Sequence, residues 1–168
     1  MKKVFIYTVA ALLFVVLGHA QDIKQAKDAI DAEQYEKAKN ILETITASKP
    51  TDGYAKFLLG NVCLLAGDYE TAKKHFDAGS TYSSKGNFNY IGLGNIALDK
   101  GDTAEAEKYL ALAVKNSSKR DLEEKVFIGK AYTFSMHPDY PKAIDILSKS
   151  RIIDPANTDV LLALADAY

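Results

Sequence analysis

Residue types that could carry out catalysis are few in this chain, and they are not spaced for it. His75 and His137 stand far apart, without the His-x3-His or His-Glu-x2-His spacing of a metal site. Cys63 lies between Val62 and Leu64 and has no neighbouring base, so we expect a buried apolar side chain there and not a reactive thiol. No serine occupies a Gly-x-Ser-x-Gly turn. The sequence therefore predicts no catalytic residue, no metal and no cofactor, and we expect a protein that is not an enzyme.

Composition and charge narrow the class of protein further. The 168 residues are 48% apolar and 26% charged, which is typical of a globular chain and not of a disordered one. The formal net charge of −1 provides no field that would gather nucleic acid, and Lys119-Arg120 is too short a basic run for a nucleic-acid patch. A single cysteine excludes an internal disulfide. We therefore expect no nucleic-acid partner.

The first twenty residues have the three-part layout of a secretory signal. Lys2-Lys3 form a basic head, residues 4–17 carry no charge, and the small residues Gly18 and Ala20 stand where a signal peptidase would read them. This apolar segment is shorter than the roughly 20 residues of a membrane-spanning helix, so a retained signal anchor is the weaker alternative. We expect residues 1–20 to be a cleavable signal peptide and the mature chain, residues 21–168, to have no membrane span. It would be exported to the periplasm or secreted.

A period of 34 residues organises the mature chain. Ala38, Ala72 and Ala106 follow one another at this interval, and so do Gly60 and Gly94. Each period contains two segments with helical spacing, and no window alternates apolar and polar residues as a strand would. The sequence therefore predicts an all-α fold of helix hairpins, with units at about 22–52, 53–86, 87–121 and 122–157 and a partial unit at 158–168.

Small residues are expected where the two helices of a hairpin cross closely. On this reasoning Gly60 would face Ala72, and Gly94 would face Ala106. Gly67 is expected to end a helix in the left-handed backbone conformation, which glycine adopts without steric cost.

These phased residues resemble the tetratricopeptide repeat family over nearly all of residues 22–168. The resemblance implies a right-handed α-solenoid of stacked antiparallel helix hairpins that binds proteins. Ser84 and Ser118 depart from the usual proline, and Thr103 departs from the usual tyrosine. The matching motifs are Leu59-Gly60, Gly67-Asp68-Tyr69 and Ala72-x3-Phe76, then Leu93-Gly94, Gly101-Asp102 and Ala106-x3-Leu110, with Tyr35-x2-Ala38-x3-Leu42 and Tyr140-x2-Ala143-x3-Leu147 in the flanking units.

The resemblance also implies a concave side, lined by the first helix of each unit, that takes extended peptides or partner helices. Asn61 and Asn95 would form a two-rung ladder, because an amide can donate to and accept from a peptide backbone at once. Alternatively, these asparagines cap turns or face water. Phe57 and Phe88 could equally be structural, whereas Tyr54 is expected to be more exposed. The full set of expected partner-binding residues is Tyr54, Phe57, Asn61, Phe88, Ile91, Asn95, Val126 and Lys130.

The predicted function is a non-catalytic scaffold that binds a peptide or protein in the cell envelope. The alternative is an N-terminal docking arm of a larger envelope protein, an enzyme or a peptidoglycan-anchored component, whose active domain lies beyond Tyr168. Residues 158–168 contain an apolar run at 160–165. Because exposed apolar patches often mark interfaces, self-association through residues 158–168 is a further prediction.

Overall fold

A computed structural model describes residues 22–82, 86–118, 120–135 and 137–168. The expected signal peptide, residues 1–20, lies outside the described residues. Within them the secondary structure is helical and contains no strand, so the expectation of an all-α solenoid is confirmed. Residues 22–31 form the first described helix. It is followed by α2 (Tyr35–Ser48), α3 (Gly53–Leu65), α4 (Tyr69–Ser80), α5 (Asn87–Asp99), α6 (Thr103–Asn116), α7 (Leu122–Phe134), α8 (Tyr140–Ile153) and α9 (Thr158–Ala167).

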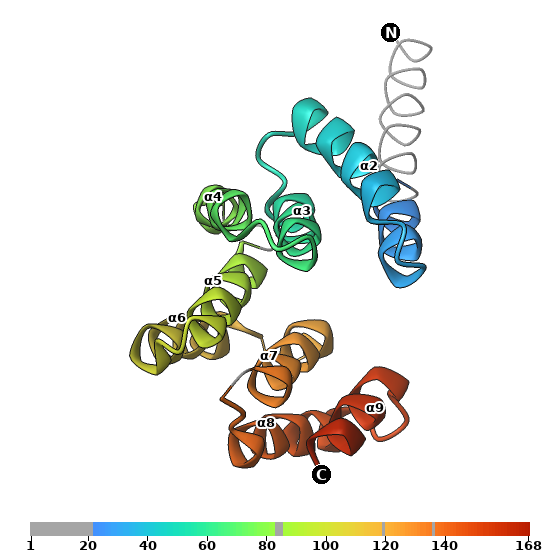
Figure 1. Cartoon of the computed structure of the whole chain (residues 1–168). Coiled ribbons are helices and arrows are strands. Elements are labelled where there is room, and N and C mark those ends of the chain that lie inside the picture. Colours follow the sequence, from blue (N-terminus) through green and yellow to red (C-terminus); the bar gives the residue numbers. More distant parts are fainter. Residues whose placement is uncertain (1–21, 83–85, 119, 136) are drawn as a thin grey trace, which may run out of the picture.

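The helices pair as consecutive hairpins that stack along an arc. The closest neighbours are α3 with α4, α5 with α6, and α7 with α8. Helices α3, α5 and α7 also pack on one another in turn and lie along the inner side of the arc, while α4, α6 and α8 lie on its outer side (Figure 1). No described helix combines the length and the hydropathy that crossing a bilayer requires.

Acidic side chains define where most of these helices begin. Asp68 precedes α4, and its carboxylate accepts a hydrogen bond from the backbone N–H of Thr71 at 3.0 Å. Such a cap satisfies a backbone donor that has no partner inside the helix. Asp52, Asp102, Asp121 and Asp139, and Asn157 before α9, accept the equivalent bond. The preceding hairpin turns use Gly67 and Gly101, whose φ angles are 78° and 74°.

The period-34 glycines make room for large side chains of the second helix in each hairpin. A Cβ on Gly60 would lie 2.3 Å from the ring of Phe76, and one on Gly94 would lie 2.8 Å from the Leu110 side chain. The glycines therefore face large apolar residues of the second helix. The reason is that Phe76 and Leu110, on the second helices, fill the space where the two helices of a hairpin cross. The first helix therefore has a glycine, with no side chain, at that point.

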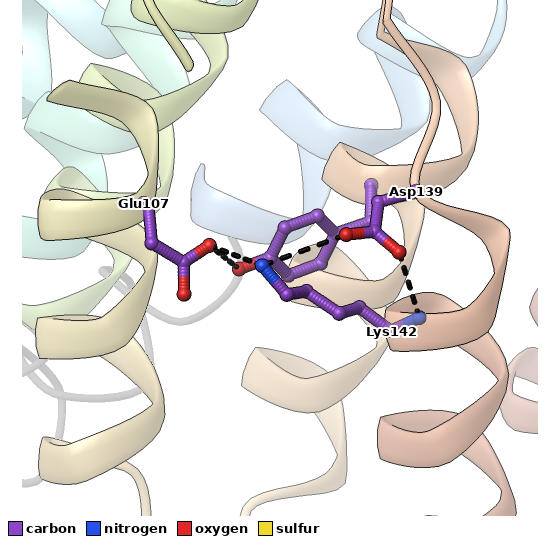
Figure 2. A network of polar contacts seen from close by, with 4 residues as sticks. Glu107, Asp139 and Lys142 are labelled. Carbon is purple, nitrogen blue, oxygen red and sulfur yellow. Dashed lines mark hydrogen bonds and ion pairs between the residues drawn. The ribbon is translucent and has the colours of Figure 1, made fainter. Parts of the chain in front are cut away.

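On the outer surface, a small polar network joins the third and fourth hairpins. Glu107 of α6 accepts hydrogen bonds from Lys142 Nζ at 2.6 Å and from the Tyr132 hydroxyl at 3.2 Å. Lys142 also lies 3.5 Å from Asp139, the residue that caps α8 (Figure 2). This network connects α6 to α7 and α8, and burial raises the pKa of the Tyr132 hydroxyl, with the nearby Glu107 charge adding to the effect.

Candidate functional site

The N-terminal halves of the inner helices meet in an aromatic cluster that fills this part of the concave side. Phe57 of α3 lies 5.2 Å, between ring centroids, from Phe88 of α5 and 5.2 Å from Phe127 of α7. Tyr54 packs edge-on against Phe88 at 4.9 Å. Edge-to-face pairs at these distances are favourable beyond the area they bury. Three hairpins are therefore joined through one buried cluster.

A polar contact beside this cluster joins the first described helix to the fourth hairpin. Lys27, from the helix of residues 22–31, lies 3.0 Å from a carboxylate oxygen of Glu123 at the start of α7. The Tyr54 hydroxyl donates a hydrogen bond to the same oxygen. Burial raises the pKa of Tyr54 well above its usual range, and the Glu123 hydrogen bond and charge raise it further. The tyrosine therefore stays protonated and acts as a donor.

The C-terminal halves of the same helices leave an open groove. Its volume is about 500 Å³, and four inner helices line it together with the residue that follows α7. Amide, charged and apolar side chains all reach its wall. The lining comprises Lys27, Ile30 and Asp31, then Leu58, Asn61, Leu64 and Leu65 of α3, Asn95 and Asp99 of α5, and Phe127, Lys130, Ala131, Phe134 and Ser135.

Three of the expected partner-binding residues lie in this groove. Asn61, Asn95 and Lys130 all line it. Within the described part of the chain, neither asparagine side chain has a hydrogen-bond partner, and neither one caps a turn. Their amides therefore retain their full capacity to donate and accept hydrogen bonds with a bound molecule.

The other five expected residues are buried in the core, and for Phe57 and Phe88 this agrees with the structural alternative. Phe57, Phe88 and Ile91 have no exposed surface. The rings of Phe57 and Phe88, from neighbouring hairpins, contact each other across the concave side. Val126 is buried on the side of α7 that packs inward. Tyr54 is only 7% exposed and not the accessible aromatic expected.

Sequence reasoning found Lys130 but missed Phe127 and Phe134, the two aromatic groove residues of α7. Phe127, Lys130 and Phe134 follow one another at i, i+3 and i+7, which is the spacing of a single helix face. Val126 and Lys130 were expected instead, because they occupy the positions of α7 that the family resemblance implies for the groove. The i, i+3, i+7 spacing could have indicated that Phe127 and Phe134 share one face of the helix with Lys130.

Ser135 Oγ is buried and has no hydrogen-bond partner among the described residues, yet the groove lining places no histidine or cysteine beside it. Burial raises the pKa of the Cys63 thiol, which disfavours the nucleophilic thiolate. Burial and the Lys56 charge lower the pKa of His75. The described residues contain no group of three or more side chains suited to hold a metal ion.

Comparison with known proteins agrees with this architecture. Residues 29–82 and residues 89–120 match two family models, each described as tetratricopeptide repeat. None of the curated proteins matches. A solved structure, the crystal structure of YrrB, "a TPR protein with an unusual peptide-binding site", is 18% identical over 88% of this chain and 74% of that chain, with a TM-score of 0.49. The two matched segments together span about half of the chain, which belongs to the tetratricopeptide repeat family.

Proposed function

We propose that this protein is a non-catalytic scaffold that binds an extended segment of a partner protein in the groove between residues 22–31, α3, α5 and α7. The observation that carries the proposal is the placement of Asn61 and Asn95, which line the groove without partners among the described residues. An unpaired amide in a partly enclosed site favours a ligand that supplies both a donor and an acceptor. A peptide backbone supplies both at every residue.

The spacing of the two asparagines suits an extended chain. They occupy equivalent positions on α3 and α5, which pack against each other. Packed helix axes lie about 8–10 Å apart, and an extended strand rises about 3.4 Å per residue. The two amides would therefore engage backbone groups about three residues apart.

Substitution of both asparagines tests the proposal directly. A peptide that binds the protein is first isolated from a displayed library of random 12-residue sequences. Each hydrogen bond lost in Asn61→Ala plus Asn95→Ala should weaken its binding by about 1 kcal/mol, so we expect a loss of about 10- to 30-fold in the affinity measured by calorimetry.

The matched control is Asn40→Ala, because Asn40 is an exposed asparagine on α2, outside the groove lining. This variant should bind as tightly as the original protein. An unchanged affinity in the double variant, with helicity retained, contradicts the proposal.

Export is part of the same proposal. Its support is the layout of residues 1–20, with a basic head, an uncharged segment and small residues at Gly18 and Ala20. Fractionation of the source cells should recover the protein from the envelope or the medium, and N-terminal sequencing should begin at Gln21. A protein that retains Met1 and remains with the cytosolic fraction contradicts this part.

A second candidate function is that of a docking arm within a larger envelope protein. It is favoured by the apolar side chains exposed around the end of α8 and on α9: Ile152 is 80% exposed, Leu162 59% and Tyr168 84%. Large exposed apolar patches often mark sites of contact with another protein segment. Intact mass measurement of the protein from its source tests this candidate, since a mass well above 18.4 kDa would support it.

A further inference from the structure

The open groove lies at the C-terminal ends of four helices that run side by side. Its lining includes the last residues of α3, α5 and α7, namely Leu65, Asp99 and Phe134, and residue 31 at the end of the first described helix. Helix C-termini carry partial negative charge from carbonyl groups that lack a partner within the helix. None of α3, α5 and α7 has a basic residue in its last turn, whereas α6 and α8 do, and Lys100, the C-cap of α5, does not line the groove. This end of the groove therefore favours a cation.

Two carboxylates add to the negative charge there. Asp31 and Asp99 both line the groove. Burial raises the pKa of Asp99, although a hydrogen bond from Tyr69 opposes this, so its charge is incompletely solvated. A cationic ligand would supply the charge stabilisation that water does not.

The lysines of the lining leave this negative charge in place. Lys27 is engaged by Glu123 at 3.0 Å, beside the buried aromatic cluster at the other end of the inner helices. Lys130 stands about one turn before the end of α7 and is a single positive charge against Asp31, Asp99 and the helix ends.

Apolar side chains surround this negative region. Leu65 is 55% exposed and Phe134 is 65% exposed, and both line the groove. An exposed phenyl ring attracts an ammonium or guanidinium group over its face and also packs against an apolar side chain. The carboxylates can bind the charged head of a lysine or arginine, and the ring beside them can pack against its apolar stem.

We infer that the groove selects partner segments in which a lysine or arginine stands beside a large apolar residue. The basic head lies against Asp31, Asp99 and the helix C-termini, and the apolar neighbour packs on Leu65 and Phe134. This inference rests on the proposed function, because it assigns the chemistry of the segment that the groove binds.

Selection from a displayed library tests whether the groove prefers a basic residue and whether it prefers a large apolar residue beside it. A random 12-residue peptide library is selected on the immobilised protein and, in parallel, on the variant Asp31→Asn plus Asp99→Asn. We expect peptides from the original protein to be enriched in a basic residue adjacent to Leu, Ile, Phe, Tyr or Trp, and we expect the variant to lose the basic preference. The control is Asp145→Asn on the outer helix α8, which removes one negative charge outside the groove and should preserve the preference.

A double-mutant cycle then measures the contact. Replacing the basic residue of a selected peptide by Gln should weaken binding about 5- to 20-fold to the original protein and to Asp145→Asn, but less than twofold to Asp99→Asn. The difference should shrink as salt rises from 50 to 500 mM, because ionic strength screens the contact.

The outcomes distinguish the two proposals. Peptides that bind in a manner sensitive to Asn61→Ala plus Asn95→Ala but show no basic preference would overturn this inference and leave the proposed function standing. A library that yields no groove-dependent binder would overturn the proposed function and this inference with it. Enrichment of acidic peptides would also refute the inference, since it would place Lys130 in control of the groove charge.

Discussion

Substituting Gly60 by alanine is a sharp test of how the hairpins pack. The ring of Phe76 lies between Gly60 of α3 and Gly92 of α5, and it has no exposed surface. A Cβ built on Gly60 would lie 2.3 Å from one ring carbon and under 3 Å from two more. The ring cannot move away toward α5, because the space at Gly92 is equally tight.

The expected magnitude follows from two opposing effects. Alanine is favoured over glycine in a helix interior by about 1 kcal/mol. Overpacking a filled core costs about 1–3 kcal/mol, and the trapped ring puts this site in the upper part of that range. We therefore expect Gly60→Ala to lower the free energy of unfolding by about 1–2 kcal/mol, or the Tm by several degrees for a chain of this size.

Urea unfolding followed by circular dichroism measures the effect. In a Phe76→Leu background, where the ring is absent, Gly60→Ala should cost about 1 kcal/mol less than it does in the original protein. Gly67→Ala serves as the control: nothing lies within 4 Å of its Cβ, but its φ of 78° makes alanine costly whatever residue 76 is. A Gly60→Ala protein as stable as the original would refute the packing described here.

Further predictions concern a cap, the contact across the arc and the last helix. The hydrogen bonds from Thr71 lower the pKa of Asp68, so the ionised carboxylate stabilises the fold at pH values above its unfolded pKa. Asp68→Ala should therefore unfold at a lower urea concentration than the original protein near pH 7. The difference in stability between the two proteins should disappear as the pH falls through the folded pKa of Asp68. Lys27→Ala should speed amide hydrogen exchange in residues 22–31 while changing global stability by less than about 1 kcal/mol, because the ion pair with Glu123 is partly exposed. Unchanged exchange would contradict that role. Leu162→Glu should lower any self-association seen by sedimentation, and an unaltered oligomer would exclude this exposed residue from the contact.

The repeat organisation could be predicted from the sequence because its signals are local. Glycines at 67 and 101 require a left-handed backbone, and an aspartate follows each one as a helix cap, so these two hairpin turns are marked within a few residues. Helical spacing of apolar residues between these marks then predicts the helices. The asparagine pair was found by the same means, since Asn61 and Asn95 repeat the period of the glycines next to them.

The accessibility of the inner wall was decided by the tertiary structure alone. Phe57, Phe88 and Phe127 belong to three different hairpins, and only the accumulated curvature of the stack brings their rings together. No local spacing therefore separates the fully buried Phe57 and Phe88 from residues that line a groove. The same curvature brings Lys27 to Glu123 across 96 positions of sequence. The period-34 pattern thus determined how many hairpins form and where they turn, whereas the packing angle between them decided which half of the concave side is filled and which half remains open. That angle depends on how side chains from distant helices fit together, and a repeat pattern read one unit at a time does not contain it.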